Sequence, residues 1–193
     1  PVLTIKDQTG LDYRLSADFV LDASGFGRVL PRLLDLEKPS GFPVRQAFFT
    51  HLEDRIDDAS YDRNKIRIIV HPELNDVWYW LIPFSNGRCS IGVVGEAEVF
   101  NIHGADRQSV LKQFITEEPG LFALLHNAVF DTPVNSIRGY SANVKSLYGK
   151  GYALLGNAGE FLDPVFSSGV TIAMKSASLA ADVLDRQRNG LPA

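Results

Sequence analysis

Two short apolar segments near opposite ends of the chain constrain its fold more than any other feature of the sequence. Segment 17–23 (ADFVLDA) runs into Ser24 and Gly25, and segment 152–156 (YALLG) runs into a loop of small residues. Nearly continuous apolar runs of this length are typical of strands buried on both faces of a mostly parallel sheet. We therefore expect the two ends of the chain to share one domain, interrupted by an insertion.

The residues between these segments are rich in aromatic and β-branched types, which favour strands. Four stretches alternate with polar turns such as Ser85-Asn86-Gly87: RQAFFTHL (45–52), KIRIIVHP (65–72), DVWYWLIPF (76–84) and RCSIGVVG (88–95). Strand patterns at this spacing predict an antiparallel sheet. The sequence thus predicts an α/β fold with an α+β insertion, divided into residues 1–40, 41–135 and 136–193.

The spacing of apolar residues also predicts a hairpin and three helices. The hairpin joins 2–5 to 13–15 through a turn at 7–10; the helices cover 109–115 after an Asp106 cap, 121–128, and 169–188. Spacings of three and four give the last helix an expected inner face of Ala173, Met174, Ala177, Ala180, Ala181 and Leu184.

The composition narrows the class of partner. A share of 45% hydrophobic and 22% charged residues is ordinary for a globular domain, and a net charge of −4 without charge runs argues against nucleic acid or anionic lipid. No apolar run approaches the roughly twenty residues of a membrane span, and the start lacks the pattern of a signal peptide. Cys89 is the single cysteine, which excludes an internal disulfide and fits a cytoplasmic location. We expect small-molecule chemistry.

The four histidines give no metal-binding pattern. His51, His71, His103 and His126 lie far apart, without a paired spacing on one helix face. We expect them to be solvated or hydrogen-bonded rather than to ligate a metal ion.

Segment 151–170 (GYALLGNAGEFLDPVFSSGV) has the composition of a ligand-binding corner. Its small residues after a strand would let a planar ligand approach the backbone, and Ser167-Ser168-Gly169 leads into a helix N-terminus, whose free amides favour an anion. The alternative is an ordinary strand-loop-helix corner with Ser168 as a helix cap and Pro164 as a rigid turn.

A second candidate segment, 78–83 (WYWLIP), alternates Trp78, Trp80 and Ile82 on one strand face. Such a face often simply fills a core under a sheet, and this alternative stays open on the residues alone.

Three motifs together resemble the flavin-dependent halogenases, within the large FAD-dependent oxidoreductase family of the glutathione-reductase type. Phe161, Pro164, Ser167 and Gly169 reproduce FxxPxxSxG, the segment Trp78 to Pro83 reproduces WxWxIP, and 22–25 resembles the DASG turn near FAD. The resemblance covers nearly the whole chain. It implies that the two ends form part of an FAD-binding Rossmann-like domain and that the insertion is a substrate domain.

The resemblance also implies site residues, a cofactor and partners. Trp78, Trp80 and Pro83 would line the passage between flavin and substrate. The residues expected to bind FAD are Ser24, Gly25, Gly156, Asn157, Ala158, Pro164, Ser167, Ser168, Gly169 and Val170. Reduced FAD, oxygen and a halide would react near the amides of Ser168 and Gly169, a flavin reductase would supply the reduced cofactor, and the substrate would be a small or carrier-protein-bound aromatic.

Departures from the family pattern limit what can be transferred. No glycine forms the GxGxxG phosphate loop, and the region of the family that carries this loop and a catalytic lysine has no counterpart here, so we expect a C-terminal fragment that is inactive by itself. Asn157 stands where most relatives carry an aspartate, and it supplies hydrogen bonds but no charge. Phe166 stands where tryptophan-specific halogenases carry a glutamate, which disfavours free tryptophan as substrate.

Two other functions remain open at this level. The same flavin scaffold serves hydroxylation or, as in geranylgeranyl reductase relatives, reduction of carbon-carbon double bonds. A chain without the phosphate loop could also be a binding module that has lost the cofactor.

Overall fold

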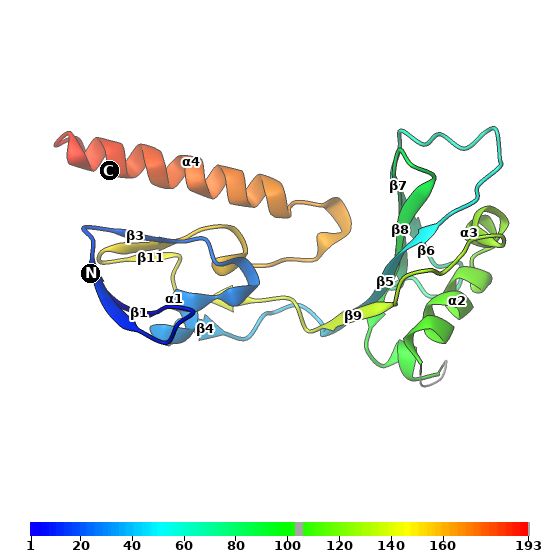
Figure 1. The fold of residues 1–193 in the computed structure, drawn as a ribbon, viewed down its shortest axis with the longest axis horizontal. Coiled ribbons are helices and arrows are strands. Elements are labelled where there is room, and N and C mark those ends of the chain that lie inside the picture. Colours follow the sequence, from blue (N-terminus) through cyan, green and yellow to red (C-terminus); the bar gives the residue numbers. More distant parts are fainter. Residues whose placement is uncertain (103–105, 193) are drawn as a thin grey trace. The chain divides into compact units, whose positions relative to one another are not determined.

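The computed structural model describes residues 1–102 and 106–192, so His103 lies outside the described residues. The chain divides into two compact units. Unit 1 comprises Pro1–Phe42 and Ser141–Ala193, and unit 2 comprises Pro43–Tyr140 (Figure 1). The sequence predicts boundaries at 40/41 and 135/136, and the assignment of an FAD-binding and a substrate role to the two units stays a prediction.

Unit 1 combines short strands with one long helix. Its elements are β1 (Val2–Lys6), β2 (Asp12–Ser16), β3 (Val20–Asp22), η1 (Gly25–Gly27), α1 (Val29–Leu33), β4 (Glu37–Lys38), β10 (Asn143–Val144), β11 (Tyr148–Gly149), β12 (Tyr152–Leu154), η3 (Gly156–Ala158), η4 (Pro164–Phe166) and α4 (Gly169–Arg188). The predicted hairpin is confirmed by the antiparallel pairing of β1 with β2, with the Asp7 carboxylate accepting the amides of Thr9 and Leu11 in the turn.

The two apolar segments at opposite ends of the chain pair as expected. β3 runs parallel to β12, with Val20 opposite Tyr152 and Asp22 opposite Leu154, and β11 adds an antiparallel strand on the other side of β12. The expectation that the first strand is buried on both faces is wrong for the described residues, because Leu21 is 43% exposed. β3 forms the edge of its three-stranded sheet, which leaves one of its sides unpaired.

Unit 2 is built on a five-stranded antiparallel sheet. The strands are β5 (Arg45–Glu53), β6 (Arg67–Val70), β7 (Trp78–Pro83), β8 (Arg88–Glu96) and β9 (Asn135–Arg138), in the order β6-β7-β8-β5-β9. The four predicted strands are confirmed, and β9 was missed because NSIR lacks the apolar alternation of a strand. A parallel strand pair contributed by both parts of unit 1 and an antiparallel insertion confirm the predicted fold class.

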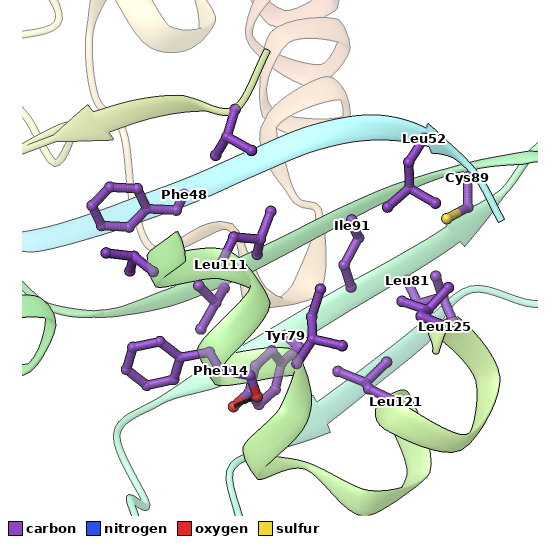
Figure 2. Close-up of a cluster of buried hydrophobic side chains, with 14 of the residues drawn as sticks. Phe48, Leu52, Tyr79, Leu81, Cys89, Ile91, Leu111, Phe114, Leu121 and Leu125 are labelled. Atoms are coloured by element: carbon purple, nitrogen blue, oxygen red, sulfur yellow. Dashed lines mark hydrogen bonds between the residues drawn. The ribbon is translucent and has the colours of Figure 1, made fainter. Parts of the chain in front are cut away.

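One face of this sheet packs on two helices, α2 (Arg107–Glu117) and α3 (Pro119–Leu125), after the turn η2 (Val99–Ile102). Figure 2 shows side chains such as Phe48, Tyr79, Leu111 and Phe114 filling the space between helices and strands. The Asp106 cap is confirmed, since its carboxylate accepts the amides of Gln108 and Ser109. α3 begins two residues before its predicted start because Glu118 caps it and Pro119 fits the first helical turn.

α4 has the predicted bounds but a different inner face. After its first residue, Gly169, the half-buried positions are Ile172, Ser176, Ala180 and Leu184, spaced by four, and no described residue of this helix is fully buried. Ala180 and Leu184 were placed correctly, whereas Met174 is 69% exposed. The prediction failed because runs of alanine on several sides of the helix hide the direction of its apolar stripe.

Candidate functional site

The DASG turn is organised by the buried carboxylate of Asp22. Its Oδ1 accepts the amide of Ser24 at 2.8 Å, and its Oδ2 accepts the amide of Leu30 at 2.7 Å, at the start of α1. Burial opposes ionisation, but these hydrogen bonds prevail and lower the pKa of Asp22 below its usual value. Ser24 in turn accepts the amide of Val29 through Oγ, and Gly25 has a φ of 58° that favours glycine.

Arg28 ties this turn to the loop after β12. Its side chain is 7% exposed, and Nη1 donates to the carbonyls of Asn157, Ala158 and Gly159 at 3.2–3.4 Å. Nη2 donates to the carbonyl of Asn143, and Nε pairs with Glu37 at 3.0 Å. One guanidinium thus fixes three consecutive carbonyls of the loop, which turns them inward.

The other edge of this loop rests on α4. The amide of Gly156 donates to Ser176 Oγ at 3.0 Å, and a Cβ at Gly156 would lie 3.0 Å from the Cβ of Ala173. A φ of 53° adds a second reason for glycine here. Ala158 is buried and Asn157 is half-buried; among the described residues no hydrogen bond engages the Asn157 side-chain amide. This amide is therefore available to a ligand hydroxyl.

The FxxPxxSxG segment continues from this loop to α4. The Phe161 ring lies 5.1 Å from the ring of Phe26, which joins the segment to the DASG turn. Pro164 begins η4, whose amide at Val165 is capped by Asp163. Ser167 has a left-handed φ of 53°, and this turn aims the chain into α4.

The N-terminus of α4 keeps its first amides unpaired within the helix, as every α-helix does. Ser168 holds the N-cap position, as in the alternative of an ordinary strand-loop-helix corner, but its side chain makes no capping hydrogen bond. Gly169 has nothing within 4 Å of where a Cβ would be, and Val170 is 71% exposed. The unpaired first amides of a twenty-residue helix, at its positive end, suit a small anion.

Unit 1 therefore gathers every residue expected to bind the cofactor. Three contacts link the segments that carry these residues. Arg28 joins the DASG turn to the loop 156–159, the Phe26–Phe161 contact joins it to the segment 161–170, and Ser176 joins the loop to α4.

Trp78 and Trp80 lie on unit 2, on the sheet face opposite α2 and α3. We call this face of the sheet the tryptophan face. Its members are the residues that strand alternation and register place on the same side as Trp78 and Trp80. They are Ala47, Phe49, His51, Ile68, Val70, Trp78, Trp80, Ile82, Ser90, Gly92, Val94 and Ile137. Neither tryptophan belongs to the cluster packed under the helices. Trp78 is nevertheless only 7% exposed, so the core-filling alternative stays open for it, whereas Trp80 is half-buried. Val70 is 57% exposed on this face.

The indole of Trp80 lies flat on Gly92 of the neighbouring strand. A Cβ at Gly92 would come within 2.3–2.6 Å of three atoms of the indole ring, and Trp80 Nε1 donates to Ser90 Oγ at 3.0 Å. The rings of Trp78 and Phe49 both lie 6.0 Å from the Trp80 ring. Three aromatic rings on one sheet face form a surface suited to a planar apolar ligand.

Pro83 points the other way. It lies opposite Cys89, which is buried in the cluster under the helices, so alternation places Pro83 on the helix-covered face. Its predicted role in the site has no geometric support from the tryptophan face and stays a prediction.

The buried histidine of unit 2, His71, has structural contacts. His71, 5% exposed, lies 3.2 Å from Glu117 through Nε2 and accepts the amides of Glu73 and Leu74 at Nδ1. In residues 1–102 and 106–192, no group of three His, Cys, Asp or Glu side chains is placed to hold a metal ion. No helix in these ranges is long and apolar enough to cross a membrane.

Sequence reasoning missed Arg28 and Gly92. Nothing in the pattern around Arg28 distinguishes it from a surface arginine, because its carbonyl partners lie more than a hundred residues away. Gly92 did carry a signal: a glycine inside a strand pattern marks a bulge or a close approach.

Sequence comparison gives relatives of one kind. No family model matches the chain. It is 29% identical over 181 residues to the 1H-pyrrole-2-carbonyl-[peptidyl-carrier protein] chlorinase of Pseudomonas fluorescens, which covers 91% of this chain and 40% of the chlorinase. It is 37% identical over 113 residues to the flavin-dependent halogenase armH5 of Armillaria mellea, covering 55% of this chain and 22% of the halogenase.

Solved structures agree with this similarity. A flavoprotein/dehydrogenase from Cytophaga hutchinsonii has 39% identity and a TM-score of 0.88, covering all of this chain and 46% of its own. The myxobacterial chondrochloren halogenase has 25% identity and a TM-score of 0.84, covering all of this chain and 44% of its own. The chain thus spans less than half the length of these relatives. The expected resemblance is confirmed: over most of its length, the chain is similar in sequence and fold to flavin-dependent halogenases.

Proposed function

We propose that the full-length protein is an FAD-dependent oxidoreductase that halogenates an aromatic substrate. In this proposal, unit 1 contributes part of the FAD site and unit 2 contributes the substrate surface. The observation that carries the proposal is the corner of unit 1, where Arg28 fixes the loop 156–159 next to the open amides at the start of α4.

The residues of this corner fit the cofactor. Reduced FAD, when bound, would supply the electrons that reduce oxygen and allow a halide to be oxidised. The half-buried Asn157 amide would hydrogen-bond a ribityl or ribose hydroxyl, and Ser24 and Gly25 would leave room for the chain of the cofactor. Gly156 and Ala158, which are buried, would shape the loop that presents Asn157. The amides of Ser168, Gly169 and Val170 would hold a halide or the negative charge of the reduced ring. Pro164 and Ser167 would fix the approach to these amides.

The tryptophan face would receive the substrate. Trp78 and Trp80 would line the passage that the oxidised halogen takes and limit direct oxygen transfer. Relatives support an aromatic: the chlorinase named above acts on a pyrrole bound to a carrier protein. Phe166, 91% exposed, places no carboxylate where a free amino acid would need one, so we favour pyrroles, phenols or carrier-bound aromatics over free tryptophan.

The proposal also names a partner and a compartment. As the resemblance to flavin-dependent halogenases implies, a separate flavin reductase would deliver the reduced FAD. A reducing cytoplasm fits the single, buried Cys89.

A second candidate function keeps the cofactor and changes the reaction. The solved structure with 39% identity is called a flavoprotein/dehydrogenase, not a halogenase. This name favours a flavin redox reaction without a halide. Hydroxylation and reduction of an organic substrate are the alternatives on the same scaffold, and the reaction products separate them from halogenation.

The test uses the full-length protein with reduced FAD, oxygen and bromide. We expect the isotope pair of bromine in the mass spectrum of a product from phenol, pyrrole, a pyrrole loaded on a carrier protein, or, less efficiently, tryptophan. Hydroxylated or reduced products without bromine would establish the second candidate. If the full-length protein binds no flavin, both enzymatic candidates fail, and the protein is a binding module that has lost its cofactor.

The anion site has its own test at Val170. V170P removes one amide from the first turn of α4, where proline is tolerated and the preceding Gly169 reduces the clash. V170A removes the side chain and keeps the amide. We expect the bromide concentration for half-maximal rate to rise at least tenfold more in V170P than in V170A, because a hydrogen bond to an ion is strong. Equal responses would place the halide elsewhere.

A further inference from the structure

We propose that Ser90 and Gly92 of β8 are positioning residues for Trp80, which they hold flat on the sheet so that its ring forms the floor of the tryptophan face. The catalytic consequence rests on the proposed function; the positioning itself does not. Neither residue belongs to the WxWxIP motif, and both lie on the strand beside it.

Gly92 is required by the indole and not by its own backbone. Its φ lies outside the left-handed region, unlike those of Gly25, Gly87 or Gly156, so an alanine could adopt the same conformation. The obstacle is the ring of Trp80, whose atoms lie 2.3–2.6 Å from where the Cβ would be. Any side chain at position 92 would therefore force the indole away from the sheet.

Ser90 fixes the remaining freedom of the ring. Its Oγ accepts the Trp80 indole N–H at 3.0 Å, and the residue is only 9% exposed, so water competes poorly for this bond. Gly92 provides the space and Ser90 defines the direction in which the ring lies. Together they exclude the conformation in which the indole would stand upright.

A flat indole determines the height of the ligand space. One row of cross-strand partners runs across four strands of the sheet: Ile68, Trp80, Gly92 and Phe49. Gly92 has no side chain, and the indole of Trp80 fills the space above it. An upright indole would occupy the space above this row and displace a planar substrate. Ser90 and Gly92 would thus act on the reaction through Trp80, without touching the substrate themselves.

The first experiment measures folding stability in this chain with a double-mutant cycle. We expect G92A to lower the folding equilibrium constant of unit 2 by tenfold to a hundredfold with Trp80 present, the usual range for overpacking. In a W80A background, we expect G92A to change it less than twofold or to raise it, since glycine is unfavourable inside strands. G41A is the control for an added methyl group outside unit 2, because Gly41 belongs to unit 1 and a Cβ there meets nothing, so it should leave the folding of unit 2 unchanged. The same cost of G92A in both backgrounds would overturn the proposal.

The second experiment follows the Trp80 indole N–H by nuclear magnetic resonance, with W80F used for assignment. We expect S90A to speed exchange of this proton with solvent about fivefold, as one lost hydrogen bond predicts, and S90T to restore it within about twofold. S85A, in an exposed turn, is the control. Exchange in S90A equal to that of the unmodified chain would show that Ser90 does not hold the ring.

The third experiment measures the consequence for the proposed reaction in the full-length protein. We expect S90A to lower the halogenated product formed per reduced FAD consumed about fivefold without weakening FAD binding, and S90T to restore it. Unchanged product yield in S90A would remove the catalytic part of the proposal. If the unmodified protein halogenates nothing, the proposed function fails, while the first two experiments still decide whether Ser90 and Gly92 position Trp80.

Discussion

The two units are stabilised in different ways. Unit 2 has a continuous apolar cluster of sheet and helix side chains, in which Leu52, Tyr79, Leu81, Ile91, Leu111 and Phe114 have no exposed surface (Figure 2). Unit 1 has a small buried cluster of Leu30, Val144 and Leu154. Its corner is held instead by the directional hydrogen bonds of Asp22 and Arg28.

The difference explains where each unit leaves apolar surface open. In unit 1, Leu33 and Met174 are 70% and 69% exposed, and a cavity of about 500 Å³ lies between α4 and the strands β11 and β12. Hydrophobic burial contributes roughly 25 cal/mol per Å² of apolar surface, so unit 1 gains less from burial and more from polar contacts. We conclude that side-chain packing stabilises the fold of unit 2, whereas hydrogen bonds hold the conformation of the loop in unit 1.

The largest expected effect tests the packing of unit 2. Phe114 has no exposed surface and lies 5.1 Å from the ring of Phe100, so F114A should destabilise unit 2 by about 3–5 kcal/mol through loss of burial and a cavity. F122A, at a position 48% exposed on the neighbouring helix, should cost less than about 1.5 kcal/mol. Urea unfolding followed by hydrogen exchange assigns each loss to a unit. Similar costs for the two variants would show that α2 does not seal the core.

The next effect tests the hydrogen-bonded corner of unit 1. R28M keeps apolar bulk but removes every donor to residues 157–159, so unit 1 should lose about 3 kcal/mol. The control is R32M, because the Arg32 side chain is 63% exposed and its nearest ion pair, to Glu37, is long at 3.8 Å. Hydrogen exchange should show opening of the loop with unit 2 unchanged. A loss of protection in unit 2 alone would contradict the division between the units.

The sequence predicts the structure of unit 2, which depends on packing, better than that of unit 1, which depends on hydrogen bonds. Apolar alternation located β5, β6, β7 and β8 within a few residues, because side-chain burial imposes a period that the sequence shows. In unit 1 it located β3, β12 and α4 and the motifs between them. The apolar pattern could not identify Arg28, because the importance of Arg28 comes from backbone carbonyls that folding brings near it. Every residue has such a carbonyl, so the sequence does not show which ones will accept a hydrogen bond.

A smaller effect concerns the acid sensitivity of the DASG turn. Because hydrogen bonds lower the folded-state pKa of Asp22 below its ordinary 3.8, the carboxylate stabilises unit 1 at higher pH, and this contribution is lost as pH falls below about 4. D22N retains one acceptor oxygen and should cost about 1–3 kcal/mol at pH 7, with a smaller cost at pH 3. Stability of unit 1 measured by hydrogen exchange at both pH values provides the comparison. A cost that does not shrink in acid would show that the charge of Asp22 contributes nothing.

The smallest effect uses the native Cys89 as a reporter of opening, so that no substitution is needed to introduce a label. Burial raises the pKa of its thiol to about 12, so at pH 8 on the order of one molecule in ten thousand carries the reactive thiolate. Alkylation by iodoacetamide should therefore be negligible in the folded chain and should proceed only as fast as unit 2 opens. F114A should accelerate labelling and R28M should leave it unchanged, since Cys89 lies in the cluster of unit 2 and Arg28 holds only unit 1. Equal acceleration by both variants would mean that the two units unfold as one, and the contrast between packing and hydrogen bonding would then describe local structure without describing separate stabilities.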